Sequence, residues 1–237
     1  IHADQPSPGE LGEGVQWVGP GDALPADARG DGEWAVLMDA GTRLEPYTLI
    51  ELLAAALGHA DARMVYAAHD VPLAPGKTLP QFTGGANVEW LRGTNYLGGV
   101  VAVRAADWLG LPGGKRYASA YRLALRASTR HGAASVHYVD KVLSHAAGQL
   151  AQGQEADEFI AAQEELRALH PGAVLEPSNL LGCWRARYPD SGAPVSLVVP
   201  TGKQQGYLRS LLLSCIRYCP GALREALLVV QDVDLPS

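Results

Sequence analysis

The chain has 237 residues, of which 47% are hydrophobic, and a formal net charge of −6. This length and composition can bury one sizeable core or two small ones, as in a globular protein. The 19 lysine and arginine residues are scattered along the chain, which excludes the clustered basic surface that binds nucleic acid. Apolar stretches fall short of the roughly 18 residues that a membrane-spanning helix requires.

The three cysteines point to a reducing compartment. Cys183, Cys215 and Cys219 are odd in number and lack metal-type spacing with histidine. Buried free thiols are therefore expected rather than a disulfide framework. The expected location is cytoplasmic, and the inner face of the membrane is included in that expectation.

The first elements lead to an acidic strand end. Residues 1–13 are rich in Pro, Gly and acids and look unstructured, and a short strand is expected at 14–18. The apolar run at 34–39 predicts a central strand that ends in the carboxylate of Asp39. An acid at the carboxyl end of a strand faces the ligand crevice in an open α/β sheet. Apolar residues at helical spacing then predict a helix at 46–57.

The elements expected next alternate between strands and helices around one long loop. They are a strand at 64–68, a long active-site loop at 71–93, a strand at 97–103, a helix at 117–129, a strand at 134–138 and a closing segment at 142–145. Such alternation predicts an α/β fold.

The last third of the chain divides into a linker and a second unit. Apolar residues at helical spacing within a charged stretch predict a helical linker at 149–193. A strand at 194–201, a helix at 207–218 and a strand at 226–232 predict a βαβ unit. Its crossover should be right-handed, and its strand ends should meet at a nucleotide-sized crevice.

Six short segments resemble motifs that follow one another in the same order in a known enzyme family. They are Met38–Gly41, Met64–Asp70, Thr94–Gly98, Tyr121–Arg126, Lys141–His145 and Val195–Thr201. In this order the chain resembles family 2 glycosyltransferases of the GT-A type, in particular tandem bacterial enzymes that build surface polysaccharide. The resemblance implies a Rossmann-like, mostly parallel sheet flanked by helices, incomplete or permuted, with an added helical linker.

The order of these motifs implies an unusual domain organisation. Residues 1–148 resemble the C-terminal portion of a GT-A domain, and 194–237 resemble the opening βαβ of a second one. In the alternative, this βαβ unit completes the first domain's sheet in permuted order, since a parallel edge otherwise leaves backbone donors unpaired. Because the chain begins at Ile1 and ends after a strand-like run, we expect a fragment of a longer protein.

The resemblance also implies a divalent cation, Mn²⁺ or Mg²⁺, on the diphosphate of a nucleotide sugar. Asp39 and His145 match the positions that hold this metal, while Gly41 stands where the second carboxylate is usual. A core or helix-end role is the alternative for His145. The family's general base is a carboxylate near the start of the late helix, where this chain has Ser119, Ala120 and Arg122, so no catalytic residue is assigned.

Further residues are matched to substrates. His69 and Asp70 are candidates for binding the acceptor or a metal, with a solvated turn as the alternative. Asn95 and Tyr96 are candidates for acceptor contact, because aromatic rings suit the C–H faces of sugars, whereas Trp90 is expected to pack. Nucleotide contacts are implied for three further residues, Pro200, Thr201 and Asp232.

The implied activity is transfer of a sugar from a nucleotide-sugar donor to a surface polysaccharide or another glycan acceptor of the bacterial cell envelope. We expect the parent protein to be a hexosyltransferase and this chain by itself to be inactive. The alternative is a degenerate, noncatalytic glycosyltransferase-like scaffold or acceptor-binding module. The missing acid at Gly41 favours this alternative for the first half taken alone.

Overall fold

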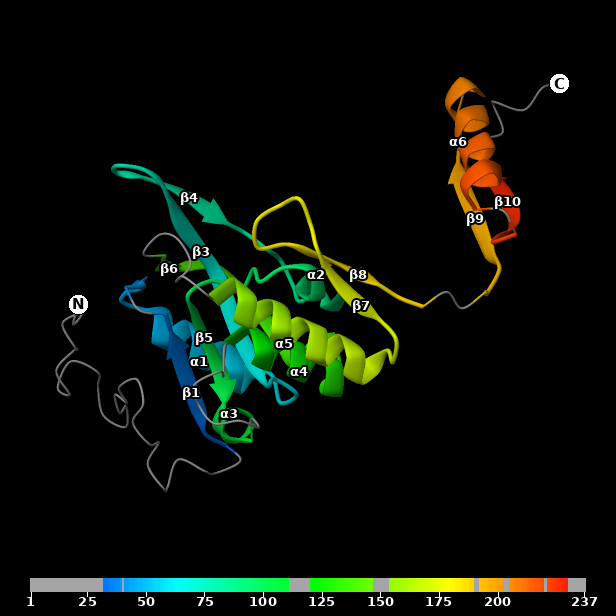
Figure 1. Ribbon diagram of the computed structural model, residues 1–237. Coiled ribbons are helices and arrows are strands. Elements are labelled where there is room, and N and C mark those ends of the chain that lie inside the picture. The colour runs from blue at the N-terminus through cyan, green and yellow to red at the C-terminus, as the bar shows by residue number, and fades with distance from the viewer. Residues whose placement is uncertain are drawn as a thin grey trace. The chain divides into compact units, whose positions relative to one another are not determined.

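A computed structural model describes residues 32–39, 41–110, 120–146, 154–189, 192–202, 205–219 and 221–229 (Figure 1). Contacts divide the chain into two units between Tyr188 and Pro189, and each unit is described by itself. The strand expected at 14–18 lies outside the described residues.

The first unit is built on a six-stranded sheet with the order β1-β5-β3-β6-β2, and β4 pairs with the far end of β3. The strands are β1 (Trp34–Met38), β2 (Arg43–Leu44), β3 (Met64–Ala74), β4 (Lys77–Gln81), β5 (Val100–Arg104) and β6 (Val136–His145). The strands expected at 34–39, 64–68, 97–103 and 134–138 are therefore confirmed in place.

The mixed α/β class is confirmed, but the strand directions differ from the expectation of a mostly parallel sheet. Within this sheet β3 and β6 are parallel, and the other pairings are antiparallel. The reason lies in where β5 starts. It starts at the edge of the sheet where the Asp70 region of β3 lies. A strand that returns from the same edge needs no crossover over the sheet face and so runs antiparallel.

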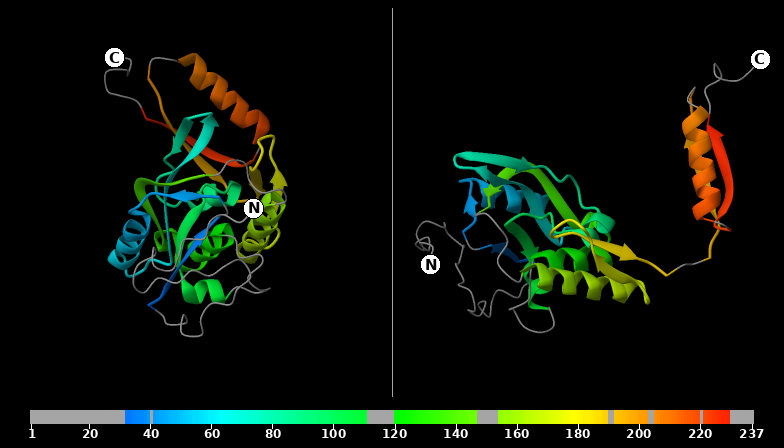
Figure 2. Two further views of the ribbon diagram at one scale, coloured as in Figure 1. Left: turned by 90° about the vertical axis from the view of Figure 1, so that its left-hand side faces the viewer. Right: turned by 45° about the horizontal axis from the view of Figure 1, so that its top comes forward.

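Helices cover both faces of this sheet (Figure 2). Side chains alternate along β3, so Val65 and Ala67 pack with Leu52 of α1 (Thr48–Gly58), and Tyr66 packs on the other face. The Tyr66 face is covered by α4 (Ala120–His131) and α5 (Gln154–Leu169). Both expected helices, at 46–57 and 117–129, are present. The remaining short helices are α2 (Val88–Gly93), α3 (Ala105–Leu109) and the 3₁₀ turn η3 (Ala133–Ser135).

The prediction of a long loop at 71–93 is wrong, because most of this segment forms strands and a helix. The strand β3 continues to Ala74 and turns at Gly76, whose φ is 72°, into β4. Asn87 then caps α2, since its Oδ1 accepts a hydrogen bond of 2.9 Å from the Trp90 N–H. Elements of five and six residues are too short to leave a readable period.

Residues of the expected linker supply part of the first unit's core. The hairpin of β7 (Val174–Pro177) and β8 (Trp184–Arg187) follows α5. Trp184 is 6% exposed, and its ring lies 5.9 Å from that of Phe159 and 6.2 Å from that of Tyr121. On the surface, Arg122 of α4 pairs with Glu164 of α5 at 2.6 Å.

The second unit has the expected βαβ order. β9 (Val195–Pro200) and β10 (Leu223–Val229) are parallel and are connected through α6 (Gln205–Tyr218). The three cysteines are free, as expected, but they are not buried: Cys183 and Cys215 are half-buried and Cys219 is exposed. Among the helices that the structure describes, each is too short or too polar to cross a membrane.

Candidate functional site

The predicted residues His69, Asp70 and His145 meet at one edge of the first unit's sheet. Asp70 of β3 and His145 of β6 are register partners, and His69 precedes Asp70 on β3. His69 and Asp70 are 9% and 7% exposed. They therefore lie in a buried strand rather than in the solvated turn that was the alternative.

His145 bridges two carboxylates. Its Nδ1 lies 2.8 Å from Asp70 Oδ1, and its Nε2 lies 2.7 Å from Glu45 Oε1. The hydrogen bond to Glu45, followed by that to Asp70, raises the pKa of His145. When the imidazole of the trio Glu45, His145 and Asp70 is charged, both of its ring N–H groups donate to carboxylates.

Glu45 was not predicted as a site residue. It follows β2, whose two residues are too few to show a strand pattern. The Glu45 backbone N–H donates to the Leu143 carbonyl at 3.1 Å, which fixes the carboxylate beside β6. In the sequence, an acid directly before Pro46 is the one feature that could have indicated this role.

The pair Gly98 and Gly99 lies between His69 and Asp39. The Asp39 N–H donates to the Gly99 carbonyl at 2.8 Å, and a Cβ on Gly98 would lie 2.6 Å from His69 Nδ1. Burial lowers the pKa of His69, although the Asp70 charge opposes the shift, and His69 Nδ1 is buried without a hydrogen-bond partner among the described residues. Asp39 is exposed as a residue, but partial desolvation of its carboxyl group raises its pKa.

The close approach of Gly98 to His69 gives a testable prediction. Gly98→Ala should destabilise the first unit by about 2–4 kcal/mol, because φ is 76° and the new Cβ would overlap His69. Gly76→Ala is the matched control, since φ is 72° and nothing lies within 4 Å of the added Cβ. This control should lose only the stability that a positive φ costs alanine, about 1–2 kcal/mol. Urea unfolding curves measure both, and equal losses would contradict the packing of His69 on Gly98.

The predicted metal pair does not fit a divalent cation as these residues are arranged. Both ring nitrogens of His145 already face carboxylates, and Gly41, with φ of 82°, offers no second acid beside Asp39. No step of a reaction is therefore derived through a metal at this edge. Elsewhere, the described residues contain one group of candidate ligands that was not predicted: His59, Asp61 and His137.

The predicted acceptor residues Asn95 and Tyr96 make structural contacts. Asn95 Nδ2 donates to Glu158 Oε1 on α5 at 2.7 Å, and its Oδ1 accepts from the Leu97 N–H at 3.2 Å. Tyr96 is 8% exposed, and its hydroxyl accepts a hydrogen bond of 3.0 Å from the Asn87 N–H. Trp90 stacks on Tyr96 with ring centroids 4.5 Å apart. These contacts hold the loop before β5 against α2 and α5.

The region expected to supply a general base contains no acid among the described residues. Ala120 starts α4, Arg122 pairs with Glu164 of α5, and Ser119 lies outside the described residues. The catalytic residue therefore stays unassigned.

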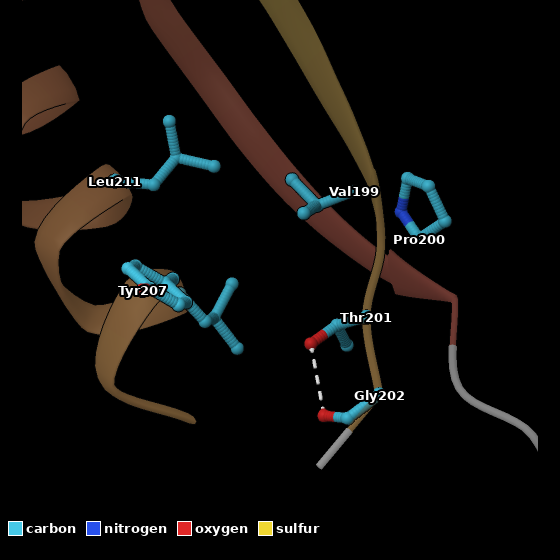
Figure 3. A pocket seen from close by; sticks show the side chains of 7 residues that line it. Val199, Pro200, Thr201, Gly202, Tyr207 and Leu211 are labelled. Carbon is cyan, nitrogen blue, oxygen red and sulfur yellow. Dashed lines mark hydrogen bonds between the residues drawn. The ribbon is translucent and has the colours of Figure 1, made fainter. Parts of the chain in front are cut away.

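The predicted nucleotide residues Pro200 and Thr201 line a pocket of about 620 Å³ in the second unit (Figure 3). The other lining residues are Val199, Gly202, Tyr207, Leu208 and Leu211. In Figure 3 the side chains of Val199 and Thr201 point toward α6, while Pro200 points away. The Thr201 N–H donates to the Val229 carbonyl at 2.9 Å, which fixes the end of β9. Asp232 lies outside the described residues.

No protein-family model and no curated protein matches this sequence. Among solved structures, the chain is similar to mannosyl-3-phosphoglycerate synthase from Rubrobacter xylanophilus, with 18% sequence identity and a TM-score of 0.40. The alignment covers 68% of this chain and 57% of that protein, so the chain spans less than two thirds of its length. The proposal of a function below is therefore based on the residues of this chain and not on this similarity.

Proposed function

We propose that the protein from which this chain derives is a glycosyltransferase that moves a sugar from a nucleotide-sugar donor to a glycan acceptor. One observation carries the proposal: residues from four separate motifs lie at one sheet edge. Asp39 and His69 flank the Gly98-Gly99 pair, and Asp70 contacts His145. Motifs that matched only by chance would have no reason to converge in space.

The charge at this edge suits a sugar better than a phosphate. Ionised carboxylates only accept hydrogen bonds, and sugar hydroxyls donate them. We therefore assign the acceptor hydroxyls to this edge, with Asp70 as the contact.

The nucleotide is assigned to the pocket of the second unit. Val199, Tyr207 and Leu211 provide apolar walls, and Thr201 adds a hydroxyl. The pocket lies where β9 ends and α6 begins, and the N-terminus of a helix favours a negatively charged phosphate. A surface polysaccharide of the bacterial cell envelope as acceptor, and action on the cytoplasmic side of the membrane, belong to the same proposal.

Amide chemical shifts of the ¹⁵N-labelled chain, titrated with uridine, guanosine, adenosine and thymidine diphosphates in the presence of Mg²⁺, test the nucleotide assignment. We expect millimolar binding of at least one nucleotide, with shifts confined to Thr201, Gly202 and the start of α6. Binding should be weak because this pocket is open to solvent.

Two variants make this experiment specific. Thr201→Val keeps the branched shape but removes the hydroxyl, so it should weaken binding. Ser196→Ala is the control, because Ser196 bonds to Glu225 and does not line the pocket. Absence of any shift at the highest nucleotide concentration would contradict the assignment, and a micromolar dissociation constant would contradict the expectation that this chain is incomplete.

A further inference from the structure

A cluster of two histidines and one aspartate lies at the end of the sheet opposite to Asp70 and His145. His59 ends α1, and Asp61 lies in the turn that leads to β3. His137 is in β6, in register with Val65 of β3. Asp70 lies five positions farther along β3 than Val65, which corresponds to about 16 Å. The cluster is therefore distinct from the site described above.

The backbone holds these three residues together. The Ala62 N–H donates to the His59 carbonyl at 3.0 Å and closes the turn. The Arg63 N–H donates to the Ser135 carbonyl at 2.8 Å and ties the turn to the start of β6. The spacing of the three side chains is thus set by main-chain hydrogen bonds and not by the side chains themselves.

Three potential ligand atoms lie close together in this cluster. One ligand atom from each residue lies within 4.8 Å of the other two. The rings of His59 and His137 are stacked with centroids 4.0 Å apart, and His137 Nε2 lies 3.5 Å from Asp61 Oδ1. Tetrahedral coordination at normal bond lengths places ligand atoms about 3.3–3.5 Å apart. An imidazole binds a metal in the plane of its ring, so the His59 ring must turn out of the stack to share an ion with His137. His59 and Asp61 are exposed, which leaves room for these side chains to turn.

An ion pair alone leaves one feature of this cluster unexplained. His137 Nε2 is buried and makes no hydrogen bond within the described part of the chain, although Asp61 is close. A buried polar atom without a partner costs free energy, and a stacked second imidazole does not compensate for it. A metal ion would bind this nitrogen, the second imidazole and the carboxylate at once.

We propose that His59, Asp61 and His137 form a binding site for a divalent transition-metal ion of the zinc type. Imidazole nitrogens together with a carboxylate suit Zn²⁺, Co²⁺ and Ni²⁺, whereas Mg²⁺ and Ca²⁺ prefer oxygen ligands throughout. Three protein ligands with an exposed face leave the fourth position to water. The bound ion would connect the turn after α1 to β6 and so stabilise the first unit.

Isothermal titration calorimetry of the metal-free chain with Zn²⁺ tests the proposal, with Mg²⁺ as the control ion. We expect one Zn²⁺ per chain with a micromolar dissociation constant, and a Tm that rises with Zn²⁺ but not with Mg²⁺. His59→Ala and His137→Ala should abolish both effects, and Asp61→Asn should weaken them. Because His59 is exposed, His59→Ala should keep the metal-free Tm of the wild type, so a folding defect does not mimic the loss.

His170→Ala is the matched control, because His170 packs on Tyr188 and is not part of the cluster. This variant should bind Zn²⁺ as the wild type does. The proposal is overturned if the wild type binds no Zn²⁺, or if His59→Ala binds it undiminished. It is also overturned if His145→Gln abolishes binding while His59→Ala retains it, since the ion would then lie at the opposite sheet edge.

Discussion

Replacement of Trp184 by alanine is expected to destabilise the first unit by about 3–5 kcal/mol. Trp184 is 6% exposed and fills the space between Tyr121 on α4 and Phe159 on α5. Removing the indole leaves a cavity between two helices that also cover the sheet. The expected loss is large because this side chain, although it lies near the end of the unit, contacts the centre of the core.

Amide hydrogen exchange in β3 and α4 is the suitable measurement, because it reports on the first unit alone in a chain of two units. Leu181→Ala is the control from the same hairpin. Leu181 is 90% exposed, so its truncation should change the stability by less than about 0.5 kcal/mol. If Trp184→Ala had an equally small effect, the hairpin of β7 and β8 would be only loosely attached.

The second large effect is expected for His145→Gln. At a pH below the unfolded-state pKa of histidine the variant should be less stable by about 1–3 kcal/mol in total, because glutamine can donate to a carboxylate but cannot give Glu45 and Asp70 the positive charge of an imidazolium. The folded-state pKa of His145 is raised. Its stabilising contribution is therefore fully present below the unfolded pKa and is lost as the pH rises through the folded pKa. The stability difference between wild type and variant should shrink over that window.

Urea unfolding at a series of pH values measures this difference. Glu45→Gln should lower the pKa of His145, which can be followed by the ring proton shifts of the folded protein, since Glu45 is the main cause of the shift. His131→Gln is the control, because His131 is exposed at the end of α4. A stability difference for His145→Gln that grew with pH would show that the trio is not held by charge.

Much of the fold could be predicted because its central elements carry strong local patterns. The apolar runs of β3 and β5 and the helical spacing of α1 predict where these elements begin to within a few residues. Strand direction could not be read in the same way, since an antiparallel β5 and a parallel β5 require the same buried apolar residues. The burial of Trp184 in the core could not be predicted either. A helix and a short hairpin show the same sequence pattern whether they pack on a core or link two domains.

The candidate site was predicted only in part, for a similar reason. Asp39 could be proposed because it follows a predicted strand, and His145 because it matches a family motif. His69 and Asp70 were expected at a strand exit, but β3 continues to Ala74. Glu45 follows a two-residue strand, and the cluster of His59, Asp61 and His137 depends on the contact of a turn with a distant strand. Asn95 and Tyr96 had the right chemistry for a sugar, but their polar atoms are used within the fold.

The most direct test of the proposed sugar transfer is the release of nucleoside diphosphate from a panel of nucleotide sugars by the full-length gene product, with a glycan acceptor present. We expect release from one donor, and this release should depend on the acceptor. Asp70→Asn should reduce this release strongly, because Asp70 loses its charge next to His145. No release from any donor, or release that Asp70→Asn leaves unchanged, would contradict the assignment of this sheet edge to sugar transfer.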